Sequence, residues 1–539
     1  MMSGLFIGGL IFFVSCNRLE TENNAQIFFY NESNGIASLD PAYAKDLASI
    51  NACEQVYNGL IQLNSDLTIK PSIAKEWQIS DDLKTYIFTL NTNVYYHENK
   101  CFGDIGTRRV KADDFVFSFN RIMDSKVSSP GLWIFEKLDK EFGLNGIKAI
   151  NDSVLMIKLK DAYAPFLSLL TMKYCSVIPS EAIRYYGSEF RKNPVGTGPF
   201  YLKYWEEDVK LILLRNDKYF EQNLPYLDAV SVSFLVDKQS EFLLFLQRKL
   251  DYVSGISPAL KDELLEQNGH LTLKYIDEFQ LLKTPYLNTE YIGILMDTNL
   301  AIVKNSPLKN LSFRKALNYS IDKLKMVNYI NKNVGMPAVK GFLPQVFYPS
   351  QITTPTYYTF DEKKAKELFA KAKIEMSLEE FPTISFAATN KSYDICKYLQ
   401  YEWSKFGVNI EIELNQWASL REMVANSKVN FFRASWIADY PDAENYFLLF
   451  GSQYLSPKGP NYTHFQSQEY DRLLKMLSFA SGIEEKVKLY QSMDSIIMAN
   501  ASVIPLYYDE VVRFLQTDIQ GFEPNSLNLM ILKNVKKIK

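Results

Sequence analysis

The chain has 539 residues, more than a single hydrophobic core supports, so we expect two to four domains. Its formal net charge is −3 and no stretch forms a basic stripe, which argues against a nucleic-acid partner. The 3 histidines lie far apart in the sequence, and no zinc-protease, CxxC, phosphate-loop or GxSxG motif is present. We therefore expect neither a cofactor nor a catalytic or metal centre.

An apolar run opens the chain and is too short to span a bilayer as a stable anchor. It ends in Phe13–Cys16, which is similar to a bacterial lipobox, so we predict a signal peptide over 1–16, a lipid on Cys16 and a polar tether over 17–25. Phe13 stands where leucine is usual, and no Lys or Arg precedes the apolar run. A plain cleaved signal and a short membrane anchor therefore remain alternatives, and each of the three exports the protein.

Apolar periodicity in the rest of the chain predicts a mixed α/β body with no internal repeat. The predicted strands are 26–30, 86–90, 209–214, 384–388, 408–414, 431–436 and 503–508. The predicted helices are 111–123, 312–321, 359–373, 394–406, a short helix from Trp417, and 483–500. The Gly/Pro-rich segment 194–201 is interpreted as a structural corner, because no Lys-Ser/Thr pair follows it to bind phosphate.

Two local patterns make sharper structural predictions. Thr359 and Glu362 have the spacing of a capping box at the head of a helix. The strand 384–388, the helix 394–406 and the strand 408–414 form a βαβ unit. The two strands of such a unit should lie parallel, with a right-handed crossover between them.

Four cysteines follow Cys16, and an exported location permits disulfide bonds between them. Four cysteines allow three complete pairings, and the sequence neither chooses among these nor excludes unpaired buried thiols. The four are Cys53, Cys101, Cys175 and Cys396.

The stretch 430–447 concentrates aromatic and charged residues around Asp439. This aspartate stands between Trp436 and Tyr440, whose rings would remove water from its carboxylate. A bare buried charge is costly, so the carboxylate needs a cation or several hydrogen-bond donors, and the ammonium group of a ligand can serve. The alternative is a strand-to-loop junction whose acidic side chains face solvent.

A series of short motifs runs along nearly all of the mature chain. They are Leu39–Pro41 (LDP), Tyr57–Leu60 (YNGL), Pro71–Trp77 (PSIAKEW), Lys111–Arg121 (KADDFVFSFNR), Val195–Phe200 (VGTGPF), Phe313–Asp322 (FRKALNYSID) and Ile504–Tyr508 (IPLYY). In this order and spacing, the chain resembles the solute-binding proteins of bacterial peptide ABC importers. This is the oligopeptide- and dipeptide-binding family, family 5 of the extracellular solute-binding proteins.

The resemblance implies a two-lobed α/β fold, similar to the periplasmic binding proteins of class II (cluster C), with an extra domain inserted in the first lobe. The first lobe would combine 26–55, 190–275 and 503–539. The inserted middle domain would be 56–189, and the second lobe would be 276–502.

The resemblance also implies a ligand site. Asp439 in Ala-Asp-Tyr matches the family aspartate that pairs with a peptide α-ammonium, and Trp436 matches part of a side-chain pocket. Arg433 matches an arginine that can meet a peptide carboxylate, and Trp417 matches a further tryptophan. The remaining candidates, by position near the family's cleft, are Tyr440, Asn461, Tyr462, Gly35 and Ile36.

The function implied by the resemblance is capture of short peptides between the lobes and their delivery to a membrane permease powered by an ATPase. The protein would be a monomer, held to a membrane by its lipid, in the periplasm or at the cell surface, and would not be an enzyme. The first alternative is the same fold binding an oligosaccharide, a metal chelate or a signalling peptide. The others are an exported hydrolase, for which no nucleophile–base pair is evident, and a lipoprotein with a chaperone or adhesion role.

Overall fold

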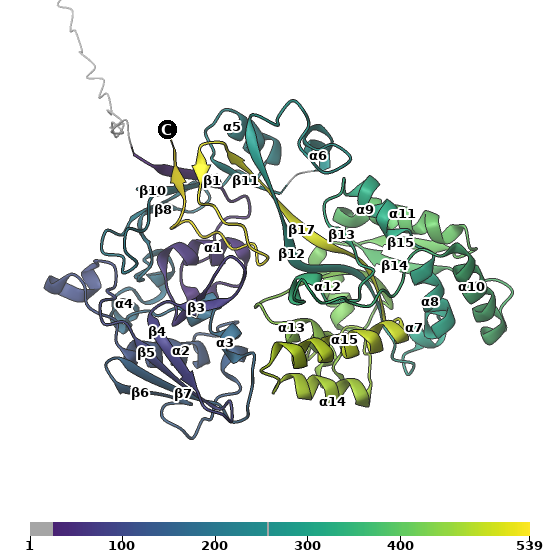
Figure 1. Ribbon diagram of the computed structural model, residues 1–539, viewed down its shortest axis with the longest axis horizontal. Coiled ribbons are helices and arrows are strands. Elements are labelled where there is room, and N and C mark those ends of the chain that lie inside the picture. The colour runs from purple at the N-terminus through teal and green to yellow at the C-terminus, as the bar shows by residue number, and fades with distance from the viewer. Residues whose placement is uncertain (1–24, 256–257, 539) are drawn as a thin grey trace, which may run out of the picture.

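The computed structural model describes residues 25–255 and 258–538. The predicted signal peptide, the lipidation site Cys16 and nearly all of the predicted tether lie outside these residues. Two lobes stand side by side and are joined by two long strands, β12 (Phe279–Ile294) and β17 (Val503–Gln516) (Figure 1).

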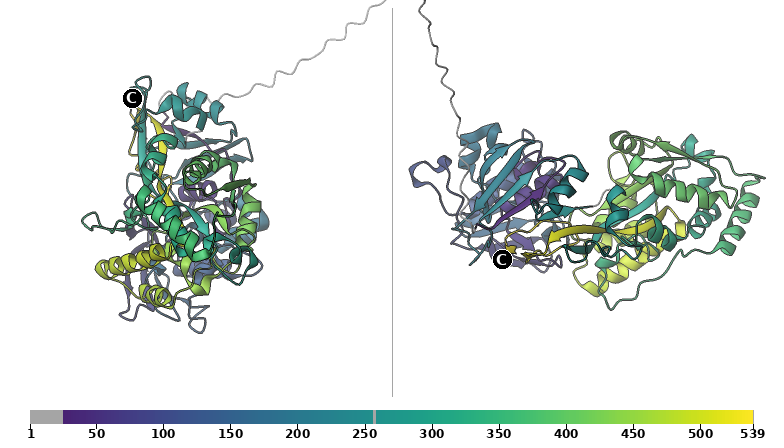
Figure 2. Two further views of the ribbon diagram at one scale, coloured as in Figure 1. Left: turned by 90° about the vertical axis from the view of Figure 1, so that its right-hand side faces the viewer. Right: turned by 90° about the horizontal axis from the view of Figure 1, so that it is seen from above.

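We call residues 25–278 together with 517–538 the first lobe, and residues 295–502 the second lobe. Seen from above, β17 passes from one lobe to the other, so the connection is a pair of strands and not a flexible linker (Figure 2).

Over its described residues, the first lobe contains part of the large sheet, a smaller four-stranded sheet and six α-helices. Its strands in the large sheet are β1 (Ile27–Asn31), β8 (Phe200–Glu206), β9 (Lys210–Arg215), β10 (Ala229–Ser233) and β11 (Tyr252–Ser254). The four-stranded sheet has the order β4 (Ala74–Ile79), β5 (Thr85–Leu90), β7 (Val154–Lys158) and β6 (Ile147–Asn151). Two further sheets have two strands each: β2 (Ile61–Leu63) pairs with β3 (Ile69–Pro71), and β18 (Ile519–Gln520) pairs with β19 (Lys536–Lys537). The helices are α1 (Leu47–Val56), α2 (Ala112–Met123), α3 (Phe166–Leu169), α4 (Ser180–Tyr186), α5 (Lys238–Leu246) and α6 (Pro258–Leu264).

The second lobe packs helices around the other end of the large sheet. Its strands are β13 (Met336–Pro337), β14 (Ile384–Ala388), β15 (Ile410–Leu414) and β16 (Phe431–Ile437). Its helices are α7 (Ala301–Lys304), α8 (Leu311–Tyr319), α9 (Lys323–Ile330), α10 (Glu362–Met376), α11 (Tyr393–Ser404), α12 (Trp417–Ala425), α13 (Glu444–Phe447), α14 (Gln468–Leu477) and α15 (Ile483–Asn500).

One sheet runs through both lobes in the order β15-β14-β16-β12-β17-β11-β1-β10-β9-β8. β12 and β17 are antiparallel from the pair Phe279–Gln516 to the pair Gly293–Val503. Their register shifts between Pro285 and Thr289, where three residues of β12 oppose Asp509 alone. Extra residues of this kind bend a strand, and the bend falls between the lobes.

Burial follows the periodicity that the sequence analysis used. In β5, Tyr86, Phe88 and Leu90 are buried on one face, and in α2 Phe115 and Phe119 are buried on one side. A large hydrophobic core fills most of the first lobe, a smaller one lies around Phe242 and Phe245, and separate cores lie in the second lobe. Since the segment 56–189 shares the first lobe's core, its limits as a separate middle domain stay a prediction.

Each predicted strand and helix is present, and the two-lobed α/β architecture is confirmed. β14 and β15 pair in parallel, as the βαβ pattern predicted. The predicted capping box at Thr359 is wrong. The N-cap of α10 is Asp361, whose carboxylate accepts a hydrogen bond of 2.9 Å from the backbone N–H of Lys364.

The cysteines Cys53, Cys101, Cys175 and Cys396 carry free thiols, and all but Cys101 are buried. Within the described ranges, no helix combines the length and apolar character needed to cross a bilayer.

Candidate functional site

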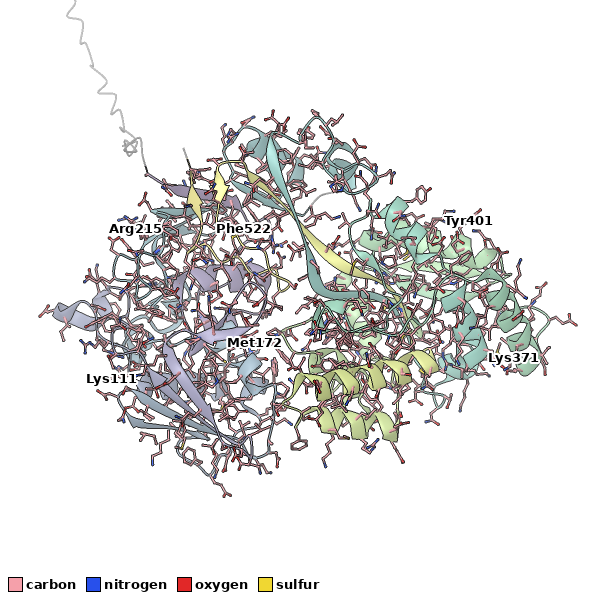
Figure 3. All side chains as sticks on the ribbon, in the orientation of Figure 1. Lys111, Met172, Arg215, Lys371, Tyr401 and Phe522 are labelled. Atoms are coloured by element: carbon pink, nitrogen blue, oxygen red, sulfur yellow. The ribbon has the colours of Figure 1, made fainter. Side chains whose placement is uncertain are left out.

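A cavity of about 340 Å³ lies between the lobes. Its lining includes Asp439 from the second lobe, Tyr286 from β12, and Met172, which lies on the side of the first lobe that faces the second (Figure 3). The other lining residues are Ala44, Lys45, Leu47, Ile50, Leu63, Trp133, Thr171, Lys173, Tyr174, Ile437, Ala438, Leu527 and Leu529.

The end of β16 positions Asp439. β16 pairs with β12 up to the pair Ile437–Asn288, and the backbone N–H of Ala438 then donates to the carbonyl of Leu287 over 2.9 Å. Asp439 is the next residue, so it leaves the sheet directly into the cavity from a backbone that both strands hold in place.

The carboxylate of Asp439 has no cationic partner within 4.0 Å among residues 25–255 and 258–538. It is accessible to solvent from the cavity, yet the surrounding protein reduces its hydration and raises its pKa. One side chain supports its charged form, since the nearby amide of Asn445 lowers the pKa of Asp439. A ligand ammonium would supply the counter-charge that the protein leaves out.

Asn445 is a member of the site that the sequence did not single out. The indole N–H of Trp436 donates to Oδ1 of Asn445 over 2.8 Å, which turns the amide N–H₂ toward Asp439. Trp436 therefore lies behind Asp439 and acts through Asn445, and it is not part of the cavity lining. Only the position of Asn445 in the aromatic run after Asp439 could have suggested this.

Arg433 does not reach the cavity. Its guanidinium is buried, pairs with the carboxylate of Glu290 and donates to the carbonyl of Tyr291 over 2.9 Å. These contacts hold β16 against β12. The carboxylate-binding role expected from the sequence has no support in this geometry, because the charge of Arg433 is already compensated.

Trp417 and Tyr440 also lie outside the cavity lining. Trp417 is 61% exposed at the start of α12. Tyr440 is buried, its hydroxyl donates to Glu444, and its ring centroid is 5.9 Å from that of Trp133, which does line the cavity. Tyr440 thus belongs to the contact between the lobes.

The four remaining sequence candidates have other surroundings. Asn461 is fully buried and its amide donates to the carbonyls of Gly451 and Phe465, so it stabilises a turn. The others, none of which lines the cavity, are Tyr462 (partly buried), Gly35 (φ +70°) and Ile36 (buried).

The sequence analysis identified none of the cavity-lining residues that come from the first lobe or from β12. Tyr174 and Tyr286 face the cavity, and burial raises the pKa of each hydroxyl to about 12, so both remain protonated donors at neutral pH. Lys173 is paired with Glu54, whereas Lys45 is exposed. No local motif marks these residues, because they meet Asp439 only in the folded chain.

The lobes touch beside the cavity through buried polar contacts. The hydroxyl of Tyr163 donates to Oε2 of Glu444 over 3.0 Å, and the backbone N–H of Ala164 donates to the carbonyl of Ser478 over 2.8 Å. Burial raises the pKa of Glu444 to about 7. The carboxylate of Glu444 therefore bridges tyrosines from both lobes, since Tyr440 donates to it as well.

No group of three or more His, Cys, Asp or Glu side chains able to hold a metal ion occurs in the part of the chain that the structure describes. The candidate site is thus a partly open cavity with one uncompensated acid, aromatic walls and hydroxyl donors. Such an arrangement has the shape and chemistry to bind a small solute, and its lining, over the described residues, places no nucleophile beside a base.

Residues 68–456 match the family described as bacterial extracellular solute-binding proteins, family 5 Middle. The chain is 24% identical over 495 residues to the dipeptide-binding protein of Escherichia coli K12, covering 89% of this chain and 88% of that protein. It is 27% identical over 517 residues to heme-binding protein A of Haemophilus influenzae, covering 92% of this chain and 89% of that protein.

Solved structures share the fold. The ABC transporter-associated periplasmic binding protein DppA from Helicobacter pylori, in complex with peptide STSA, superposes with a TM-score of 0.74 at 24% identity and covers 96% of this chain and 98% of its own. With the match over residues 68–456 and the cavity between two lobes, the chain belongs to family 5 of the bacterial extracellular solute-binding proteins.

Proposed function

We propose that this protein captures short peptides in the cavity between its lobes and presents them to an ABC importer. The observation that carries the proposal is Asp439, a carboxylate in a ligand-sized cavity that has no cationic side chain within 4.0 Å of it in the ranges 25–255 and 258–538. A peptide α-ammonium placed there forms a charge-assisted hydrogen bond, which is stronger than a neutral one.

The size and lining of the cavity favour a short ligand. About 340 Å³ lies at the small end of the range for ligand sites, roughly 300–1,000 Å³. Aromatic and aliphatic walls accept side chains of different shapes, while the hydroxyls of Tyr174 and Tyr286 offer hydrogen bonds to a peptide backbone. Relatives named for dipeptide binding and for a peptide complex support the same ligand class.

A non-peptide solute is the second candidate, because one relative is named a heme-binding protein. The aromatic lining would suit a planar ring system, but such a ligand gives Asp439 no ammonium partner. Mass spectrometry of the small molecules released from the denatured protein, expressed from Asn17 onward, separates the two. Peptides of varied sequence with free N-termini support the proposal, and a single tetrapyrrole or chelate contradicts it.

Export, anchoring and the transport partners are part of the proposal. The protein is secreted, carries lipid on Cys16 and acts as a monomer in the periplasm or at the cell surface, without enzymatic activity. Ligand binding stabilises closure of lobes that hinge at β12 and β17. The closed form then docks on a permease driven by an ATPase.

Replacement of the anchor residue tests the proposal directly. Asp439→Asn keeps the shape and removes the charge, so a peptide ammonium would be buried without its partner. We expect calorimetric affinity for the co-purified peptides to fall at least roughly tenfold, which is about 1.4 kcal/mol. Asp81→Asn, an exposed aspartate outside the cavity lining, is the matched control. Equal affinity of the Asp439→Asn protein and the wild type would remove Asp439 from the site.

A further inference from the structure

Arg513 is a buried arginine with no acidic side chain within 4.0 Å in the ranges 25–255 and 258–538. It lies on β17, where this strand pairs with β11 on one side and with β12 on the other. We infer that its guanidinium holds a small monovalent anion, chloride, in a site separate from the cavity between the lobes. The inference does not depend on the peptide proposed above, because Arg513 is not part of the cavity lining.

The other buried arginines show what a buried guanidinium requires. Three arginines are buried in the part of the chain that the structure describes. Arg314 donates to four backbone carbonyls over 2.8–3.2 Å, and Arg433 is paired with Glu290. Arg513 is 1% exposed, and its guanidinium makes one hydrogen bond to the described residues, from Nη2 to Oδ1 of Asn528. Its charge is therefore the exception among the three.

The surroundings of Arg513 are neutral. Its Nε and Nη1 are buried and have no hydrogen-bond acceptor among the described residues. The ring of Phe522, labelled in Figure 3, lies over the guanidinium with its centroid 5.8 Å from Cζ. A ring face attracts a cation without neutralising it, and the amide of Asn528 carries no charge either. Since an uncompensated charge away from water is costly, this guanidinium needs a negative charge beside it.

The nearest acids in the sequence are engaged elsewhere or face solvent. Glu510 and Asp518 already pair with a lysine and an arginine, at 3.6 and 3.1 Å. Asp509 accepts a hydrogen bond of 3.0 Å from the amide of Asn288. Glu523, which follows the ring that covers the guanidinium, is exposed. The protein thus supplies donors at this point of the sheet and no carboxylate to receive them.

The two neighbouring strands add hydroxyl groups on the same face of the sheet. Ser254 of β11 is directly opposite Arg513, and Thr284 of β12 is opposite Val511, two residues along β17. Residues paired in this way point their side chains to one face, with Cβ atoms about 4.5–5.5 Å apart. Neither hydroxyl makes a hydrogen bond to another described residue. Both can therefore donate to an anion that the guanidinium attracts.

Charge and burial decide the class of anion. One guanidinium balances one negative charge, whereas a doubly charged phosphate or sulfate would leave an excess charge away from water. The side chain is too deeply buried for an extended ligand to reach it from the surface. A bound halide would also stabilise the wall of the cavity between the lobes, because Asn528, which Arg513 holds, lies between the lining residues Leu527 and Leu529.

Thermal unfolding in different salts tests the inference. The protein expressed from Asn17 onward is dialysed into sodium gluconate and titrated with sodium chloride at constant ionic strength. We expect the melting temperature to rise by at least about 2 °C, because an anion that binds only the folded chain stabilises it. Arg513→Met should lose this response and be at least as stable as the wild type in gluconate, since it removes an uncompensated buried charge. Arg433→Met, the control, should be less stable and keep the response.

Crystals grown in sodium bromide locate the anion without any variant. We expect an anomalous peak beside the guanidinium of Arg513. No peak there, or equal melting temperatures of the wild type in chloride and gluconate, would mean that water alone meets these donors and would overturn the inference. A chloride response that survives in Arg513→Met, or a peak that disappears when peptide is bound, would overturn a separate site. None of these results bears on the proposed function, which peptide release and Asp439→Asn test.

Discussion

The hydrogen bond between Tyr163 and Glu444 should hold the lobes together around the ligand. Its oxygen atoms are 3.0 Å apart, both groups are buried, and they come from opposite lobes. The substitution Tyr163→Phe removes the hydroxyl and keeps the ring, so the packing beside the cavity is retained. When the lobes are apart, water hydrates both groups, so the bond stabilises only the closed form.

The size of the effect depends on the charge of Glu444. The pKa of Glu444 is raised to about 7, mainly by burial. The charge of Asp442 also raises it, whereas the hydrogen bonds from the two tyrosines and the charge of Lys137 lower it. Near pH 8 the carboxylate is ionised, and a hydrogen bond to a charged group contributes about 2 kcal/mol, or roughly 30-fold in the closing equilibrium. Near pH 6 it is protonated and the bond contributes about 1 kcal/mol, or roughly fivefold.

Calorimetry with the co-purified peptides measures this loss of closure as a loss of affinity, and small-angle scattering should show a larger radius of gyration for the variant with ligand. The control is Tyr86→Phe, which removes a hydroxyl bonded to the carbonyl of Tyr163 within the first lobe. That variant should lower stability without lowering affinity. If Tyr163→Phe binds peptide as tightly as the wild type near pH 8, the contact between the lobes does not contribute to closure.

Two further predictions concern buried charges in the second lobe. The pKa of Asp494 is raised by burial from 3.8 to about 7, so the folded protein holds this proton more tightly than the unfolded chain. The free energy of unfolding should therefore fall as pH rises from about 4 to about 7, by up to about 4 kcal/mol for this group. In thermal unfolding, Asp494→Asn should make this decline less steep. A variant whose stability falls as steeply as that of the wild type would contradict the assignment. Arg433→Ala leaves Glu290 without its cation and should lower the free energy of unfolding by about 3–5 kcal/mol, while peptide affinity of the folded protein changes less than about twofold. Lost affinity with unchanged thermal stability would instead place Arg433 in the ligand site.

Local patterns predicted the elements well because each depends on neighbours in the sequence. The strands β14 and β15 and the helix between them follow from apolar spacing alone. Asp439 was identified because it stands between Trp436 and Tyr440 and matches the Ala-Asp-Tyr turn of the family. β17 was predicted to end at Tyr508, since Asp509 and Glu510 interrupt its apolar run. It continues because β12 pairs with it beyond the interruption, and a partner strand is not visible in a local window.

Apart from Asn445, which is close to Asp439 in the sequence, the parts of the site that the sequence analysis missed or misassigned depend on contacts across the fold. The sequence around Arg433 shows no acidic partner for it, because its partner Glu290 lies on the adjacent strand β12 and is far away in the sequence. Lys45 belongs to no motif, and only the folded chain shows that it lines the cavity. The capping box failed for a simpler reason, because the spacing of Thr359 and Glu362 was followed although Asp361, the stronger N-cap residue type, stands two residues later.

The register shift in β12 has a mechanical consequence. Tyr286 lies in the short segment where β12 loses its pairing with β17, and the same residue lines the cavity. A peptide in the cavity therefore touches the point about which the two strands bend. If the lobes close on the ligand as proposed, Tyr286 would contact the ligand and also lie at the bend between the lobes, so no relay of side chains would be needed to couple binding to closure.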